Sequence, residues 1–393
     1  MNVEKICSDL VKIKSENPPG NTADVAEYIR NFLENTGIAA ELTENPGGHN
    51  NVISKYQNGP LLLTGHIDVV PAIDDGWEIP PYEGRIDETY VHGRGAADMK
   101  GGCAAILSSV EKLADTRGID KINLAFVCDE EGGGKYGTRY LIEKELIHPC
   151  DCLIAEPTLP HSPCIGQKGL CRYTVEFNGQ PGHSSVHPII GTSAVMQAMD
   201  FLNYMDILHQ RESPYSPEME KLLTESAKLS GAGYEKDISP VFRRIMYNPG
   251  IISGGERANI VAQKCRLTMD MRIPWGVEVT ELLQEIRDHL PEKAVLTVDT
   301  TANASITGQD TFLVQTACNA ISEIYGVESK PMVQWAASDA RALRLAGFNA
   351  IEYGPGEIEG MHGLNEKVRR DHLEKCVVIY EKVIKAYQEK QEK

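Results

Sequence analysis

Two adjacent glutamates, Glu130 and Glu131, lie in the stretch CDEEGGG at residues 128–134. Successive side chains of an extended chain point to opposite faces, so we expect the two carboxylates to have different roles. One could bind a cation while the other takes the proton of an attacking water, which is general acid–base chemistry. The alternative is an ordinary acidic loop, and the choice depends on which residues can join the pair.

Three further stretches offer side chains of the same chemical kind. In TGHIDVVP, His66 and Asp68 are two residues apart and face the same side of an extended segment, which suits a metal-ligating imidazole with an acid beside it. Glu156 lies in AEPT, and His362 lies in GMHGLNE. No single stretch is specific, because an isolated His or Glu in a loop is usually solvated.

Asp98 lies in HGRGAADMKGG, residues 92–102, which comes close to the dinucleotide-binding pattern G-x-G-x-x-G. Asp98 replaces the third glycine, and its carboxylate would repel a pyrophosphate, so we reject nucleotide binding. EGGGKYGT, residues 131–138, also fails the phosphate-loop pattern, because Lys135 is followed by Tyr136. A carboxylate held between glycine-rich turns instead suits a position bridging two cations.

Taken together, these stretches supply two histidines and three carboxylates for ligation, with one glutamate to spare. That combination is typical of a two-metal hydrolytic site, in which a shared carboxylate holds the ions about 3.5–4 Å apart. Imidazole and carboxylate ligands without thiolates favour two Zn²⁺ ions, with Co²⁺ or Mn²⁺ as substitutes. The ten cysteines are scattered, and we expect free thiols.

The elements that must position these residues alternate between strand and helix. Short apolar runs predict buried strands, and apolar residues at helical spacing predict helices between them. The predicted strands are residues 60–65, 122–128, 152–155 and 350–353. The predicted helices include the N-terminal stretch from Val3 and residues 24–35, 102–114, 141–146, 312–325 and 371–389. This alternation predicts a parallel α/β sheet, whose ligands bind outside the carboxyl ends of the strands.

The pattern changes near residue 169. Strands at residues 170–178, at 294–300 and twice within 250–272 combine with helices at 191–208 and 277–290 in the order βαββαβ. That order is typical of a small ferredoxin-like domain. We therefore predict a discontinuous catalytic domain, residues 1–168 and 306–393, with residues 169–305 inserted. Residues 209–240 are interpreted as a helical excursion or a long loop.

Charge and hydropathy exclude several classes of partner. Asp plus Glu number 56 against 39 Lys plus Arg, a net charge of −17, which argues against nucleic acid or an anionic membrane. No stretch approaches the ~18 consecutive apolar residues of a membrane-spanning helix. The N-terminal residues lack the apolar core of a signal peptide, so we expect a cytoplasmic protein.

Seven motifs in order resemble a known family over almost the whole chain. They are GHIDVVP, HGRGAADMKGG, CDEEGGG, AEPT, PGHSS, SDAR and GPG…MHGLNE. They resemble the co-catalytic zinc amidohydrolases, which include acetylornithine deacetylase, succinyl-diaminopimelate desuccinylase, aminoacylase and glutamate carboxypeptidase. The resemblance implies a zinc-peptidase-like α/β catalytic domain with a mostly parallel central sheet. It also implies that the inserted ferredoxin-like α+β domain is a lid and forms a homodimer interface.

The resemblance assigns a role to each candidate residue of the metal site. It implies two ligand groups with a shared carboxylate: His66, Asp98 and Glu156 for one zinc, and Asp98, Glu131 and His362 for the other. Glu130 resembles the general base, and Asp68 the acid beside His66. The family also implies a cis peptide bond between Asp98 and Met99.

On the substrate side, the resemblance implies that His183 reaches a neighbouring active site and donates to the developing oxyanion. Arg272 and Asn259 match lid positions near the substrate carboxylate and carbonyl. Ser338 in SDAR and Gly354 in GPG are expected to contact substrate. Two alternatives remain open: His183 could cap a helix, and Arg272 could form a surface ion pair.

The reaction implied is hydrolysis of the amide bond of an N-acyl amino acid. A dipeptidase or carboxypeptidase of the same family is the alternative, and a metal-binding relative without catalysis is less favoured because ligands and base are all present. The substrate is expected to be a small N-acyl amino acid or a short peptide. Many relatives read GGTSDAR where this chain reads WAASDAR, residues 335–341, so the acyl group stays open.

Overall fold

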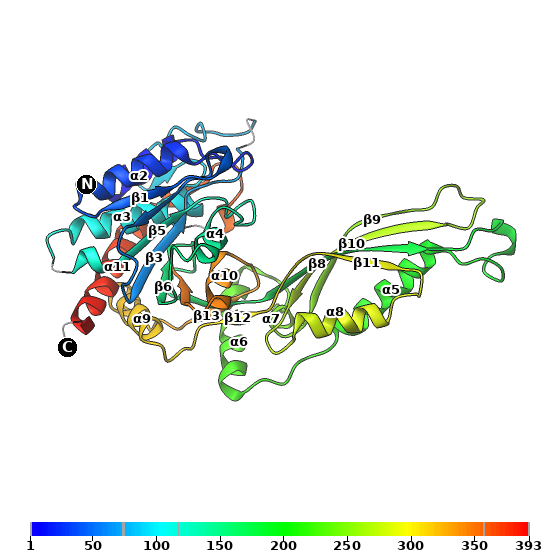
Figure 1. Ribbon diagram of the computed structural model, residues 1–393. Coiled ribbons are helices and arrows are strands. Elements are labelled where there is room, and N and C mark those ends of the chain that lie inside the picture. The colour runs from blue at the N-terminus through cyan, green and yellow to red at the C-terminus, as the bar shows by residue number, and fades with distance from the viewer. Residues whose placement is uncertain (1, 73–74, 117, 357, 392–393) are drawn as a thin grey trace. The chain divides into compact units, whose positions relative to one another are not determined.

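The computed structural model describes residues 2–72, 75–116, 118–356 and 358–391. The chain divides into two compact units (Figure 1). The first comprises Met1–Ile165, Thr307–Met332 and Ser338–Lys393, and the second Gly166–Ile306 and Val333–Ala337. Among the described residues, no helix is long and apolar enough to cross a membrane. The predicted division into a catalytic domain and a lid remains a prediction about function.

A β-sheet with four parallel central strands, in the order β5-β3-β6-β14, forms the centre of the first unit. Antiparallel strands continue it, β2 and β1 beyond β5 and β7 beyond β14. The bounds are β1 (Ala40–Thr43), β2 (Asn51–Ser54), β3 (Leu61–His66), β5 (Asn123–Val127), β6 (Asp151–Ile154), β7 (Cys164–Gln167) and β14 (Asn349–Glu352). The central strands β3 and β5 are buried at every residue and mostly apolar, as expected where both faces of a parallel sheet are covered.

Helices cover both faces of this sheet (Figure 1). On one face, Leu62 of β3 packs in a buried cluster with Leu141 of α4 and Leu343 of α10. Helix α3, which is buried along most of its length, lies on the other face and packs against α1 and α11. The bounds are α1 (Val3–Lys12), α2 (Ala23–Asn35), α3 (Gly101–Lys112), α4 (Thr138–Glu143), α9 (Phe312–Tyr325), α10 (Asp339–Leu345) and α11 (Arg370–Gln391).

A separate two-stranded ribbon joins two segments that are far apart in sequence. Strand β4 (Tyr90–His92) pairs antiparallel with β15 (Lys367–Arg369). The ribbon therefore brings HGRG next to GLNE. A single irregular helical turn, η2 (Ala96–Lys100), follows β4 and leads into α3.

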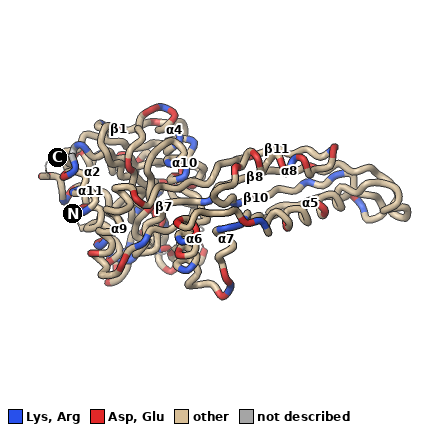
Figure 2. Tube along the Cα trace, turned by 90° about the horizontal axis from the view of Figure 1, so that it is seen from below, with Lys and Arg blue, Asp and Glu red and all other residues tan. Residues whose placement is uncertain are grey.

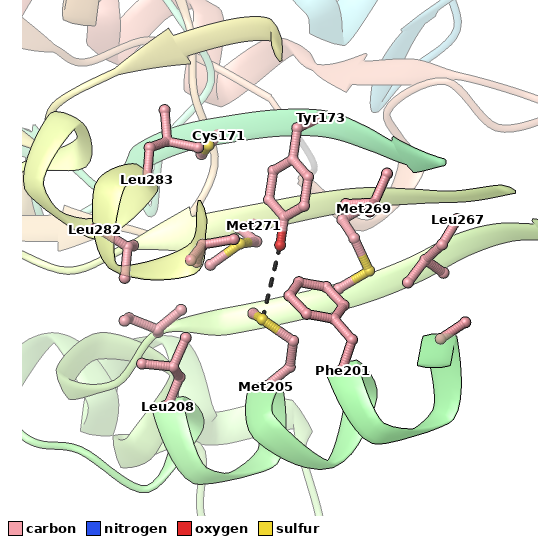
Figure 3. Close-up of a cluster of buried hydrophobic side chains, with 14 of the residues drawn as sticks. Cys171, Tyr173, Phe201, Met205, Leu208, Leu267, Met269, Met271, Leu282 and Leu283 are labelled. Carbon is pink, nitrogen blue, oxygen red and sulfur yellow. Dashed lines mark hydrogen bonds between the residues drawn. The ribbon is translucent and has the colours of Figure 1, made fainter. Parts of the chain in front are cut away.

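In the second unit, four antiparallel strands lie in the order β11-β8-β10-β9. Their bounds are β8 (Gly169–Asn178), β9 (Met246–Gly254), β10 (Lys264–Ile273) and β11 (Val295–Ala302). Helices α5 (Ala194–His209) and α8 (Val279–Asp288) cover one face. Alternating residues of β8 and β10 point into an apolar core, where the Tyr173 hydroxyl lies 3.7 Å from the Met205 sulfur (Figure 3).

The stretch at residues 209–240 is a helical excursion rather than a long loop. It contains α6 (Pro217–Ser230), and α7 (Ser239–Arg243) follows. Trp335 packs edge-on against Phe242, with ring centroids 5.5 Å apart, and against Tyr234 at 6.4 Å. The two departures from the family pattern, residues 209–240 and WAASDAR, are therefore in contact with each other.

The predicted fold class is confirmed, since the four central strands of the sheet are parallel and the inserted unit has the βαββαβ order. Predicted helix 312–325 coincides with α9, while the N-terminal bound of α4 lies three residues earlier than expected. All ten cysteines lie in the described part of the chain and are thiols rather than disulfides. Acidic and basic residues are interspersed along both units (Figure 2).

Candidate metal centre and active site

Four strands of the first unit deliver the candidate residues to the same edge of the sheet. Strand β3 ends at His66, β5 runs into Glu130 and Glu131, and β6 leads to Glu156. Strand β14 leads into the loop that carries His362. Because β5, β3, β6 and β14 are parallel, their carboxyl ends meet at one edge, as ligand sites of open α/β sheets do.

One group of buried side chains gathers around His66. Its Nε2 lies 2.9 Å from Asp98 Oδ1 and 3.7 Å from Glu156 Oε1. All three side chains are buried. One ligand atom from each residue lies within 4.8 Å of the others, a spacing that could hold a metal ion.

A second group forms around His362. Its Nε2 lies 3.1 Å from Asp98 Oδ2 and 3.1 Å from Glu131 Oε1. Asp98 therefore directs one oxygen toward each histidine, as a bridging carboxylate would. The peptide bond between Asp98 and Met99 is cis, as the resemblance implied.

The residues of both groups suit divalent cations for two reasons. Their donor atoms are of the right type, and the raised pKa values of His66, His362 and Glu156 show that the site favours bound positive charge. Burial alone would lower the pKa of His66, but Glu156 and Asp98 outweigh it and raise that pKa well above its usual value. Hydrogen bonds to Asp98 and Glu131 raise the pKa of His362 to about 10. Burial raises the pKa of Glu156 well above its usual range. Such a concentration of carboxylates favours positive charge, and oxygen and imidazole donors suit zinc-like ions.

Glu130 is the spare glutamate, outside both groups. Burial is the largest cause that raises its pKa, and the nearby carboxylates Asp339, Glu131 and Asp98 add to it, while His66 opposes it. A partly buried glutamate with a raised pKa beside the metal ligands has the properties of a general base that returns its proton.

Asp68 holds the turn that carries both glutamates. Its two carboxylate oxygens accept hydrogen bonds from the backbone N–H groups of Glu130 and Glu131, each at 3.2 Å. The backbone carbonyl of Asp68, rather than its carboxylate, lies 2.9 Å from His66 Nδ1, while the nearer carboxylate oxygen is 3.6 Å away. The position of Asp68 beside His66 is as expected, and its carboxylate also orients the glutamate turn.

Asn17 is a contributor that the sequence did not indicate. Its side-chain amide donates to Asp68 Oδ2 at 2.8 Å and to Asp129 Oδ1 at 3.0 Å. Asp129 has a positive φ of 64° and accepts the backbone N–H of Tyr136 at 3.0 Å. Asn17 thus links the two sides of the glutamate turn, yet an asparagine before two prolines carries no ligand signal.

In the second unit, the segments of His183 and Asn259 lie side by side. His183 forms a β-bridge with Ile260, and the N–H of Ser184 donates to the Asn259 carbonyl at 3.3 Å. His183 Nδ1 accepts the N–H of Ser185 at 3.2 Å and caps the short helix η4 (Ser184–Val186). The capping alternative is therefore observed, and capping through Nδ1 does not engage Nε2.

The remaining predicted substrate residues have local roles. Arg272 Nε donates to Asp270 at 3.1 Å, the ion pair that the sequence left open. Ser338 donates to Glu352 at 2.6 Å and caps α10. A Cβ at Gly354 would lie 2.1 Å from the Ala155 carbonyl oxygen, so close backbone packing requires glycine there. Contact of any of these residues with substrate stays a prediction.

Comparisons with known proteins agree with this architecture. A succinyl-diaminopimelate desuccinylase of Helicobacter hepaticus is 28% identical over 322 residues, which cover 78% of this chain and 75% of that protein. An acetylornithine deacetylase of Vibrio campbellii is 29% identical over 272 residues, covering 69% and 66%. The crystal structure of the metallo-carboxypeptidase Sso-CP2 of Sulfolobus solfataricus has a TM-score of 0.78 at 18% identity and covers 98% and 99% of the two chains.

The similarity to Sso-CP2 shows the fold, and the family follows from the sequence. The pattern of peptidase family M20/M25/M40 matches residues 62–386, a span that includes every candidate metal ligand. The resemblance drawn from the seven motifs is thereby confirmed. The protein belongs to peptidase family M20/M25/M40 and is a metal-dependent amide hydrolase.

Proposed function

We propose that this protein hydrolyses the amide bond of an N-acyl amino acid and releases a carboxylate and an amine. The observation that carries the proposal is the pair of ligand groups that share Asp98, with Glu130 beside them. The similarity to a desuccinylase and a deacetylase supports an acyl amino acid as the substrate class. We further propose zinc as the metal, because the ligands are imidazoles and carboxylates.

Each predicted residue has a defined part in this chemistry. Two divalent cations held by the ligand groups would polarise the substrate carbonyl and acidify the attacking water. Glu130 takes a proton from that water and delivers it to the leaving amine, since its raised pKa suits both directions of transfer. Asp68 keeps Glu130 in place through the Glu130 backbone N–H.

The substrate-binding residues of the second unit follow from the family resemblance. His183 would donate to the oxyanion in a neighbouring subunit's active site. Such a donor typically lowers the activation barrier by about 2.7–4 kcal/mol. Arg272 would exchange Asp270 for a substrate carboxylate, which it can bind in a charge-assisted pair. Asn259 would contact the substrate carbonyl, and Ser338 and Gly354 would line the pocket.

We also propose a cytoplasmic homodimer formed through the inserted unit. Strand β9 is at the edge of its sheet, and its Ile251 and Ile252 are 64% and 52% exposed. On α5, Met199 and Ile207 are 51% and 63% exposed. An exposed edge strand with apolar side chains is suited to pairing with a second copy.

The test is a substrate panel on protein reconstituted with Zn²⁺, Co²⁺ or Mn²⁺. Acetylornithine, succinyl-diaminopimelate and simple dipeptides are compared by kcat/KM. Highest turnover on one of the acyl amino acids supports the proposal. Highest turnover on dipeptides would assign a dipeptidase instead, and no turnover with two bound metal ions would indicate a metal-binding relative without catalysis.

A further inference from the structure

The second ligand group depends on a loop that must be held in place. The side chain of His362 is 52% exposed, and its backbone has a positive φ of 61°. Its partner Asp98 lies in the irregular turn η2, with non-helical backbone at Asp98 and Met99. Neither ligand is supported by a regular helix or strand, so side-chain contacts must set their geometry.

A buried ion pair connects the two segments that carry these ligands. Arg94 Nη1 donates to Glu366 Oε2 at 2.5 Å, and the two side chains are only 3% and 1% exposed. The pairing of β4 with β15 brings these residues together across 272 positions of sequence. The guanidinium of Arg94 also lies 5.3 Å from the Trp77 ring, which covers it.

The ion pair reaches the backbone of both ligands. Glu366 Oε1 accepts the N–H of Ala97 at 2.9 Å and the N–H of Asp98 at 3.1 Å. Arg94 Nη2 donates to the backbone carbonyl of His362 at 3.3 Å. One buried pair therefore contacts the peptide groups of Asp98 and His362 from opposite ends.

Stability alone gives little reason for charges at this position. Well-packed apolar side chains of similar volume are often as stable as a buried ion pair, or more so. The peptide groups of Ala97, Asp98 and His362, however, need hydrogen-bond partners that apolar side chains do not offer. Arg94 and Glu366 therefore contribute hydrogen bonds to the backbone of the residues that would bind metal, which apolar side chains could not make.

We propose that Arg94 and Glu366 are positioning residues that set the cation affinity of the group formed by Asp98, Glu131 and His362. The inference rests on the proposed function, because it takes these residues as ligands. Mutation of a residue that orients a metal ligand without binding the metal itself typically lowers metal affinity by roughly 10–100-fold. In the group of His66, Asp98 and Glu156, only Asp98 is contacted by the Arg94–Glu366 pair. The cation affinity of that group should therefore change less.

The experiment is a Co²⁺ titration of metal-free protein, followed by calorimetry and by the visible absorption of the bound ion. Wild type, Glu366→Gln and the double variant Arg94→Met/Glu366→Leu are compared. Glu4→Gln is the matched control, because Glu4 is another buried carboxylate, 3.0 Å from an arginine, Arg370. Melting temperature is recorded for every variant.

We expect Glu366→Gln to weaken binding of one Co²⁺ equivalent by about 10–100-fold and the other by much less. The double variant buries no unpaired charge, so its melting temperature should lie above that of Glu366→Gln. It should stay below that of wild type, because the peptide groups of Ala97, Asp98 and His362 lose their partners, and the same equivalent should stay weak. Its absorption spectrum should also differ from that of wild type, since the ligand geometry has changed. Glu4→Gln should bind both equivalents as wild type does.

Three results would overturn the inference. Unchanged affinity of both equivalents in Glu366→Gln would do so, and so would a double variant that regains affinity together with stability, because the pair would then only support the fold. Equal weakening of both equivalents would also contradict it, since His362 belongs to one group alone. Wild type that binds fewer than two equivalents would instead refute the proposed two-metal function.

Discussion

Two buried regions of this protein have opposite chemistry. Between the sheet and helices of the second unit, the buried residues are apolar, among them Phe201 and Leu267 (Figure 3). At the carboxyl edge of the first unit's sheet, they are ionisable, with His66, Asp98 and Glu156 only 2%, 6% and 8% exposed. The apolar region removes hydrocarbon from water, while the ionisable region removes charge from water.

The difference separates what stabilises the fold from what performs the chemistry. Burial of apolar surface contributes about 25 cal/mol per Å² to folding. Buried carboxylates oppose folding unless protons or cations compensate them, and burial is the largest cause that raises the pKa of Glu130 and Glu156. We therefore expect substitutions to affect activity in one region and stability in the other.

Glu130→Gln should have the largest effect. Turnover of the metal-reconstituted variant should fall by about 10²–10⁴-fold, because it lacks the base that takes the proton of water. Both metal ions should remain bound. The free energy of unfolding of the metal-free variant should equal or exceed that of wild type, because a neutral amide of the same shape replaces a partly buried acid. Steady-state kinetics, metal analysis and urea unfolding measure these three quantities.

Glu143→Gln, at an exposed position on α4, is the matched control and should leave turnover unchanged. Near-normal turnover of Glu130→Gln would remove this residue as the base. A marked loss of stability in that variant would contradict the contrast between the two regions.

Phe201→Ala tests the apolar region. Phe201 is 4% exposed and packs 5.8 Å, centroid to centroid, from Phe177. Loss of the ring should lower the free energy of unfolding by about 3–5 kcal/mol, through lost transfer energy and the cavity left behind. Metal stoichiometry at low temperature should not change. Gln284→Ala on the exposed side of α8 should stay within about 0.5 kcal/mol of wild type, and a comparable loss there would show that the effect is not specific to the core.

The pH dependence of the metal-free protein tests the ionisable region. Asp98 and Glu131 raise the pKa of His362 from 6.5 to about 10, so the folded state keeps a proton that the unfolded state releases. This stabilisation is complete below pH 6.5 and is lost as the pH rises through 10. Because His362 is half exposed, the change should be on the order of 1 kcal/mol. Urea unfolding across this range measures it.

Bound metal should remove this dependence of stability on pH, because an imidazole that binds a metal ion is neutral. His362→Gln should remove it as well, whereas His148→Gln, at an exposed loop position, should retain it. A metal-free protein whose stability rises over the same range would contradict the assigned direction.

Tyr234→Ala should have the smallest effect. The residue is 60% exposed and contacts Trp335 edge-on, a kind of contact worth about 0.5–1.5 kcal/mol. A double-mutant cycle with Trp335→Leu measures the coupling between the excursion and WAASDAR. Cation affinity should not change in either variant. Strictly additive effects would mean that the two departures from the family pattern are independent.

Much of this protein could be predicted from local sequence. Apolar runs located the four parallel strands β3, β5, β6 and β14, helical periodicity located α9 with its observed bounds, and the change of pattern near residue 169 predicted the βαββαβ order of elements. Errors at helix α4 were a matter of a few residues, because helix ends depend on capping contacts that periodicity does not report.

The partners of the candidate ligands could not be predicted in the same way. Asn17 lies 112 positions from Asp129, and Arg94 lies 272 from Glu366. Helix and strand periodicity relate only residues a few positions apart, so neither pair could be found from spacing. Trp335 and residues 209–240 likewise read as two separate departures until packing brought them together.

The sequence by itself determined the side-chain chemistry and the family, because ligand types and their order along the chain are written in single residues and short motifs. Only the tertiary structure decided which oxygen of Asp98 approaches which histidine, and which buried groups hold the glutamate turn and the His362 loop. The physical reason is that hydrogen bonds depend on distance and direction between atoms. Strand pairing and helix packing set those quantities for residues that are remote in sequence.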